Sequence, residues 1–112
     1  MNIFHEIYQS PEGGTVDLQK EELPTDGYFV GGVGAPLVFE TVDRLAPIPL
    51  DSFARGLKSR YLGWWTDSET GQLWIDGSDW YQSLSATLVT ARDRGELAVY
   101  DVANQSEIRC SR

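Results

Sequence analysis

One stretch of the sequence decides the expected fold: Gly63-Trp64-Trp65-Thr66-Asp67-Ser68-Glu69-Thr70-Gly71-Gln72-Leu73-Trp74-Ile75-Asp76. It carries three of the four tryptophans of the chain. The β-forming residues on either side of its polar centre predict two strands, 61–66 and 72–76, joined by a tight turn. Asp67 can accept backbone N–H groups at the start of that turn. Gly71 can adopt the positive φ that closes a type I hairpin turn.

The tryptophans of this hairpin form the candidate contact surface. Neighbouring residues of a strand point to opposite faces of a sheet, so one of Trp64 and Trp65 should enter the core while the other faces outward. Trp74 can pair with one of them across the strands. Tryptophans anchor many protein interfaces, and carboxylates steer basic partners. The candidate partner-binding residues are Trp64, Trp65, Asp67, Glu69 and Trp74, and the alternative is that all three indoles pack internally.

Two apolar segments separated by glycines precede the hairpin. Residues 28–30 and 37–42 are rich in β-forming side chains, and residues 31–36 lie between them. This spacing predicts a pair of strands with 31–36 as their turn. The alternative is one long strand that the glycines bend.

A first helix is predicted before the tryptophan hairpin. Pro47 and Pro49 are incompatible with a helix interior, so we expect the helix to begin after them. Asp51 is then the expected N-cap, and the apolar spacing continues to about Arg60.

A second helix is predicted after the hairpin. Asp79 and Gln82 have the spacing of a capping-box variant, which predicts a helix over residues 80–94. Gly95 is the expected helix stop. Residues 97–102 then form a strand with apolar side chains on both faces, which is typical of a strand inside a sheet.

The expected element order is β(β)αββαβ. Without the optional second strand it is the split βαβ arrangement of ferredoxin-like domains. We therefore predict one small α+β domain over residues 27–112, with an antiparallel or mixed sheet covered on one face by two helices. Residues 1–26 contain two turn signals, at 10–14 and 24–27. We expect them to form an N-terminal arm, partly mobile or draped on the domain.

Composition and charge limit the classes of function. The chain has 112 residues and a formal net charge of -8, with 17 acidic residues against 9 lysines and arginines. Direct binding of nucleic acid is disfavoured, because phosphate contacts need a basic face. The single cysteine, Cys110, excludes an internal disulfide and favours a reducing compartment. Without a signal-peptide pattern or an apolar run of membrane-spanning length, we expect a cytoplasmic protein that does not bind membranes.

The residues show no pattern for catalysis or for a cofactor. His5 is the only histidine and Cys110 the only thiol, and they lie near opposite ends of the chain. Nucleophilic catalysis needs a base beside the nucleophile. Residues 31–34 are rich in glycine but lack the lysine of a phosphate-binding loop. We expect no catalytic residue and no cofactor, and no spacing singles out a carboxylate pair for acid–base chemistry.

Acidic residues near the hairpin raise the question of a metal site. They are Asp67, Glu69, Asp76 and Asp79. Carboxylates are the ligands that Ca²⁺ and Mg²⁺ prefer, but this spacing departs from an EF-hand loop. Turn formation and helix capping account for the first and the last of them. We therefore expect no metal.

Three segments carry a resemblance: residues 27–32, 65–71 and 91–101. Together they resemble small uncharacterised proteins encoded by actinobacteria and by their phages and mobile elements. The similarity covers residues 27–108 and leaves the N-terminal arm outside. It implies an accessory role in a host or phage context, and no catalytic residue is carried over with it.

These observations predict a small acidic, non-enzymatic protein that binds another protein, one with a basic surface. Two alternatives stay open. The first is an inhibitor that mimics nucleic acid, which requires continuous negative potential along one face. The second is a small-molecule enzyme that uses Asp or Glu carboxylates, which a deep pocket with two convergent carboxylates would favour.

Overall fold

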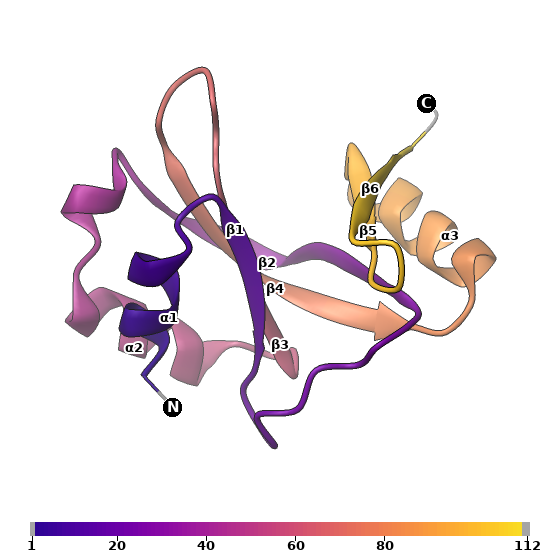
Figure 1. The fold of residues 1–112 in the computed structure, drawn as a ribbon, viewed down its shortest axis with the longest axis horizontal. Helices are drawn as coiled ribbons and strands as arrows, with labels where there is room; N and C mark the ends of the chain where they lie inside the picture. The colour runs from indigo at the N-terminus through magenta and orange to yellow at the C-terminus, as the bar shows by residue number, and fades with distance from the viewer. Residues whose placement is uncertain (1, 111–112) are drawn as a thin grey trace.

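Residues 2–110, which the computed structural model describes, fold into three α-helices, six strands and one 3-10 turn. In chain order these are α1 (Ile3–Gln9), β1 (Gly13–Asp17), β2 (Tyr28–Phe39), η1 (Val42–Arg44), α2 (Pro47–Gly56), β3 (Tyr61–Thr66), β4 (Leu73–Tyr81), α3 (Leu84–Arg94), β5 (Ala98–Asp101) and β6 (Ser106–Arg109). The predicted α+β class is confirmed (Figure 1). None of these helices is long and apolar enough to cross a membrane.

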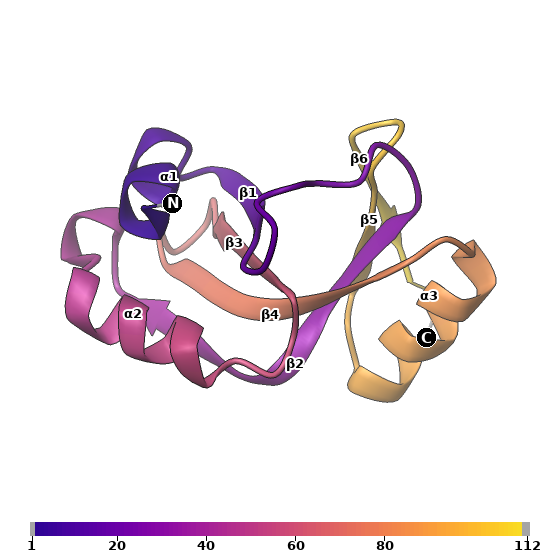
Figure 2. The same cartoon turned by 90° about the horizontal axis from the view of Figure 1, so that it is seen from below.

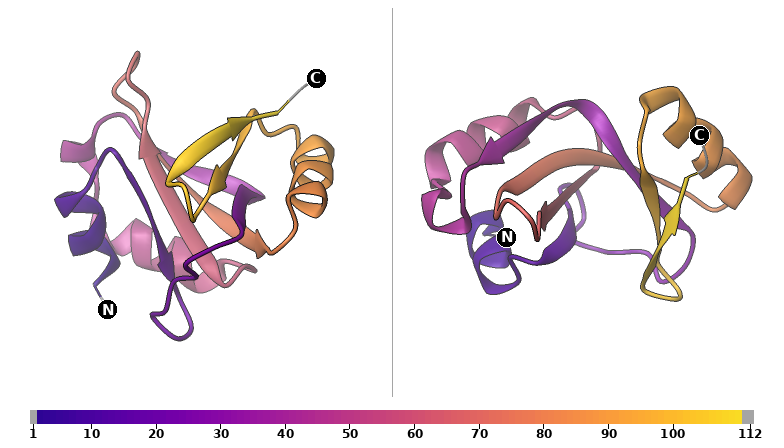
Figure 3. Two further views of the ribbon diagram at one scale, coloured as in Figure 1. Left: turned by 45° about the vertical axis from the view of Figure 1, so that its right-hand side comes forward. Right: turned by 90° about the horizontal axis from the view of Figure 1, so that it is seen from above.

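The strands pair in one antiparallel sheet in the order β1-β3-β4-β2-β5-β6. The sheet curls along its length, as the two views of Figure 3 show. The predicted tryptophan hairpin is confirmed as β3 and β4, and β3 has the predicted bounds. The strand predicted over 97–102 is confirmed as β5, which lies inside the sheet between β2 and β6.

Strand β2 corrects the predicted hairpin between residues 28 and 42. Residues 31–36 are not a turn, because the whole segment forms one strand of 12 residues paired with β4. The register shifts twice along this pair, between Val30 and Val33 and between Val33 and Leu37. Extra residues in one strand of a pair bend it, so the glycines kink β2 without ending it. The alternative prediction, one long strand bent by the glycines, is confirmed.

Helix α2 begins five residues earlier than predicted. Pro47 and Pro49 lie in its first turn, where backbone N–H groups have no partner inside the helix, so the prolines cost no hydrogen bond there. Ala46 occupies the N-cap position without a side-chain hydrogen bond. The prediction that Asp51 caps this helix is therefore wrong, and the helix ends at Gly56, before the predicted Arg60.

Helix α3 begins later than predicted because strand β4 continues to Tyr81. Asp79 is not an N-cap, since it pairs with Val30 of β2 within the sheet. The N-cap is Ser83, whose side chain accepts a hydrogen bond from the Ala86 N–H at 3.3 Å. The predicted stop is confirmed: Gly95 has a φ of 71° and follows the last residue of the helix.

Two groups of buried side chains pack the helices against the two ends of the sheet. The larger group joins α1 and α2 to β1, β3 and β4, and it comprises Ile7, Val16, Leu45, Leu50, Leu62, Trp64, Leu73 and Ile75. The smaller group joins α3 to β2 and β5, and it comprises Val30, Ala91 and Val99. Helices α1 and α2 accordingly lie at one end of the molecule and α3 at the other (Figure 2).

The segment expected as an N-terminal arm lies against the domain through α1 and β1. Ile7 of α1 and Val16 of β1 are buried in the larger group. Strand β1 pairs with β3 and forms one edge of the sheet. The chain then crosses from that edge to the start of β2 at the other end of the molecule (Figure 2).

Candidate functional site

The turn of the tryptophan hairpin has the predicted hydrogen bonds and projects from the body of the molecule (Figure 1). The Asp67 N–H donates to the Gln72 carbonyl and the Gly71 N–H donates to the Asp67 carbonyl, both at 2.8 Å. The Asp67 carboxylate accepts the Glu69 N–H at 2.9 Å. Gly71 has a φ of 76°, as the turn prediction requires. The side chain of Asp67 thus shapes the turn, while Glu69 is exposed at its tip.

The two neighbouring tryptophans point to opposite faces of the sheet, as predicted. Trp64 is only 6% exposed, and its indole Nε1–H donates to the Ser10 carbonyl at 2.8 Å. This tryptophan therefore belongs to the core and does not offer a surface to a partner. Trp65 is 48% exposed. Of this adjacent pair, Trp65 is the ring that a partner can reach.

Trp65 belongs to a row of three side chains that cross the sheet. Its ring stacks on that of Trp74, with centroids 5.9 Å apart and an interplanar angle of 13°. Trp74 pairs in turn with Val38 of β2, which is 37% exposed. Directly opposed residues of an antiparallel sheet share a face. We call Val38, Trp74 and Trp65 the tryptophan row.

The indole N–H of Trp74 adds an unusual feature to this row. The atom is buried, and it has no hydrogen-bond partner within residues 2–110. Buried polar groups without a partner are uncommon and cost free energy. This donor belongs to the ring that lies between Val38 and Trp65 in the row.

Acidic residues surround the end of the sheet at which the row lies. Asp67 and Glu69 come from the turn. Glu12 precedes β1, and its carbonyl accepts the Thr66 N–H at 3.5 Å. Glu40 follows the last residue of β2. We call Glu12, Glu40, Asp67 and Glu69 the acidic rim.

The sequence did not indicate Val38, Glu12 or Glu40. The pairing of β2 with β4 places Val38 beside Trp74. The pairings of β1 with β3 and of β2 with β4 bring Glu12 and Glu40 to the same end of the sheet. Those pairings join segments far apart in the chain, so no local pattern reports them. The alternation of residues in β2 could have placed Val38 on an outer face only once its register was known.

A second cluster of charged side chains lies beside the kink of β2. Asp76 of β4 accepts the Gly32 N–H at 3.0 Å. A Cβ atom on Gly31 would lie 2.6 Å from Asp76 Oδ2 and 3.0 Å from Glu96 Oε1, so the two carboxylates converge on this glycine. Arg94 of α3 donates to the Gly31 carbonyl at 3.0 Å.

Burial decides the protonation of this carboxylate pair. Burial raises the pKa of Asp76 to about 6, against the Gly32 hydrogen bond, which lowers it; the neighbouring Glu96 carboxylate raises it further. Burial also raises the pKa of Glu96, while Arg94 opposes the rise. Two convergent carboxylates with raised pKa values can hold a proton at weakly acidic pH. No sequence spacing predicts this pair, because its members are 20 positions apart with a helix between them.

The raised pKa of Asp76 predicts a gain in stability when its charge is removed. The folded state binds a proton on Asp76 up to about pH 6, whereas an unfolded carboxyl releases it near pH 4. The stabilisation from this group is therefore present below about pH 4 and lost as the pH rises to 6. We expect Asp76→Asn to raise the free energy of unfolding by about 1 kcal/mol at pH 7.

Urea unfolding at pH 7 and at pH 4 measures this effect. The gain of Asp76→Asn over the parent should appear at pH 7 and disappear at pH 4. Asp93→Asn on the exposed face of α3 removes the same charge and is the matched control. If Asp76→Asn is less stable than the parent at pH 7, the inference that burial raises the pKa of Asp76 is contradicted.

The four acidic residues first considered for a metal do not come together. Asp67 and Glu69 lie at the turn, Asp76 lies at the kink of β2, and Asp79 pairs with Arg94 at 2.6 Å. Within residues 2–110 no group of three His, Cys, Asp or Glu side chains is placed to hold a metal ion.

Two open hollows lie beside the loop that follows β1. Their volumes are about 340 and 430 Å³. The first is lined by Ile3 and residues 18–21, and the second includes Glu6, Thr15 and Leu23. Neither is lined by Asp76 or Glu96, so the converging carboxylates do not face these hollows.

Comparison with known proteins identifies neither a family nor a function for this chain. No family model matches the chain, and no curated protein or solved structure is significantly similar to it.

Proposed function

We propose that this protein is a non-enzymatic accessory protein that binds another protein through the tryptophan row and the acidic rim. The observation that carries the proposal is the exposure of Trp65, which is 48% accessible although its strand pairs with a neighbour on each side. Tryptophan is among the residues most enriched at interface hot spots, where burial of a large ring supplies much of the binding energy. The cytoplasm is the compartment proposed for this role.

The charge of the rim points to a partner with a basic surface. All four residues of the acidic rim carry carboxylates, and the chain as a whole has a net charge of -8. Charges at the edge of an interface accelerate association and select partners of opposite sign. The same charge opposes self-association through this surface, because two copies would bring like charges together.

We also infer that the four inner strands form a split βαβ core with its helices on one face. The order β3-β4-β2-β5 supports this inference, as do the positions of α2 between β2 and β3 and of α3 between β4 and β5. Leu62 and Trp64 of β3 share a face with residues that pack against α1 and α2. Such an arrangement leaves the opposite face, with the tryptophan row, open to a partner.

Among the alternatives, the enzyme has one observation in its favour, the convergence of Asp76 and Glu96 at Gly31. Acid–base catalysis would also need a cavity that brings a substrate to them. Mimicry of nucleic acid would need an unbroken acidic face, and two of the carboxylates are neutralised in ion pairs with Arg60 and Arg94. Protein binding therefore has the stronger support.

The test compares capture of a partner by two variants. Trp65→Ala should weaken capture at least about tenfold, because an anchoring tryptophan typically contributes 2 kcal/mol or more. Tyr100→Ala, which removes another exposed ring from β5, is the matched control and should leave capture unchanged. Lysate of the native host supplies the candidates, chemical cross-linking identifies the bound protein, and thermal melting shows that both variants are folded.

The outcome discriminates among the proposals. A partner that binds the parent and Tyr100→Ala but is lost with Trp65→Ala supports the proposed surface. A partner that Trp65→Ala retains contradicts it. If the captured protein is a nucleic-acid enzyme that nucleic acid displaces from this chain, mimicry replaces the proposed function.

A further inference from the structure

One side of Trp65 is covered and the other is open. Its covered side stacks on Trp74. On its other side along the same row lies Gly13 of the edge strand β1, which pairs directly with Trp65. Within residues 2–110, and leaving out its chain neighbours, the only heavy atom within 4 Å of the position of a Cβ on Gly13 is the Trp64 carbonyl oxygen, at 3.5 Å. We call this open space beside Trp65 the Gly13 flank.

The chemistry around the Gly13 flank favours a flat cation. An indole face attracts cations through its quadrupole. A guanidinium group is planar and weakly hydrated, so it stacks on aromatic rings better than an ammonium does. It also forms paired hydrogen bonds with carboxylates, which the acidic rim provides at the neighbouring strand ends. A neutral apolar group would form no charge-assisted hydrogen bond with those carboxylates.

We propose that the Gly13 flank receives an arginine side chain of the protein partner. Its guanidinium stacks on the open face of Trp65 and pairs with carboxylates of the acidic rim. The glycine at position 13 is what keeps the flank open, since a larger residue on this edge strand would fill it. This inference rests on the proposed function and specifies which side chain the partner presents.

Three capped peptides test the inference directly on the full chain. The first alternates arginine with leucine, which matches the alternation of a strand. The second carries lysine in place of arginine and keeps the charge, and the third carries citrulline and keeps the shape. Binding is followed by NMR through the indole N–H signal of Trp65, which is assigned by its loss in Trp65→Phe.

The arginine peptide should shift this indole signal and bind about threefold more tightly than the lysine peptide, because a stacked guanidinium at an exposed site contributes a modest free energy. The citrulline peptide should bind more weakly than either. Gly13→Leu should remove the preference for arginine. Gly13 has room for a side chain, so this variant should fold like the parent, which thermal melting checks.

Equal affinity of the arginine and lysine peptides would overturn the inference, because charge alone would then explain binding. Binding of neither peptide would also overturn it, as would a preference for arginine that survives in Gly13→Leu. These results are separable from the proposed function. If Trp65→Ala loses the captured partner while the arginine preference is absent, the proposed binding surface is supported and the proposed arginine contact is contradicted.

Discussion

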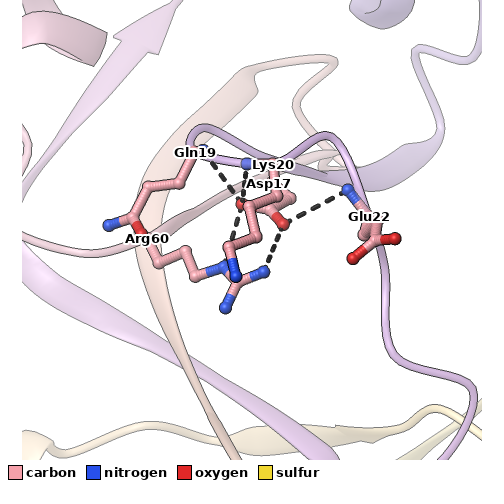
Figure 4. Close-up of polar contacts among 5 residues, drawn as sticks. All are labelled: Asp17, Gln19, Lys20, Glu22 and Arg60. Atoms are coloured by element: carbon pink, nitrogen blue, oxygen red, sulfur yellow. Dashed lines mark hydrogen bonds and ion pairs between the residues drawn. The ribbon is translucent and has the colours of Figure 1, made fainter.

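Replacing Asp17 with alanine should lower the free energy of unfolding by about 3 kcal/mol, because a buried acceptor with several partners would be lost. Asp17 is 1% exposed, and Figure 4 shows the groups gathered around its carboxylate. The Arg60 guanidinium donates two hydrogen bonds, at 2.7 and 3.0 Å. The N–H groups of Gln19, Lys20 and Glu22 donate three more, at 2.9 to 3.2 Å.

This network has a structural role that explains the size of the effect. It closes the loop that follows β1 and ties it to the residue before β3, 43 positions away. Alanine would leave three backbone donors and a guanidinium without their acceptor. Thermal melting should show a fall of about 10 °C, given the entropy of unfolding of a domain of this size.

Asp51→Ala is the matched control for this experiment. Asp51 is exposed on α2, where the sequence pattern had predicted a helix cap. Because the helix already begins at Pro47, Asp51 does not cap it. Loss of the Asp51 carboxylate should therefore change the free energy of unfolding by less than about 0.5 kcal/mol. Comparable losses of unfolding free energy in Asp17→Ala and Asp51→Ala would show that the buried network contributes no more to stability than an exposed carboxylate does.

The same carboxylate gives a dependence on pH of opposite sign to that of Asp76. The Arg60 guanidinium, helped by the three backbone donors, holds the pKa of Asp17 well below its usual range, although burial opposes the shift. A lowered pKa stabilises the fold above the unfolded value near pH 4, and this stabilisation is lost as the pH falls further. The gap between the parent and Asp17→Ala should therefore narrow below about pH 4.

The features that could be predicted from the sequence are those encoded by neighbouring residues. The β3–β4 turn depends on Asp67 and Gly71, which are four positions apart, and it forms as predicted. The opposite orientation of Trp64 and Trp65 follows from the alternation of a strand. Which of the two faces the core depends on where α1 and α2 pack, and no local pattern contains that information.

The errors occurred where distant pairing overrides local preference. Residues 79–81 resemble the start of a helix, yet they extend β4 because β2 supplies partners for them as far as Tyr28. The kinked β2 likewise keeps its strand through the glycines because β4 pairs with it on both sides of the kink. Glu96 approaches Asp76 only in the folded arrangement of the curled sheet and α3, so no local pattern contains their convergence.

Replacing Gly14 with valine should lower the free energy of unfolding by about 3 kcal/mol, because the added side chain overpacks a rigid ring. Gly14 pairs with Trp64 across the β1–β3 ladder. A Cβ on Gly14 would lie 2.4 Å from Cζ2 of that indole and 2.7 Å from its Cη2. The ring cannot give way easily, since it is buried and its N–H is bonded to the Ser10 carbonyl.

Gly13→Val separates this close approach from the general effect of a β-branched residue on β1. Its added Cβ would meet only the Trp64 carbonyl oxygen, at an ordinary 3.5 Å. Valine also favours a strand more than glycine does, so Gly13→Val should melt at or slightly above the temperature of the parent. The NMR signal of the Trp64 indole N–H, assigned by its loss in Trp64→Phe, should shift in Gly14→Val and stay unchanged in Gly13→Val. If the two valine variants melted at the same temperature, the Trp64 ring would not exclude a side chain at position 14.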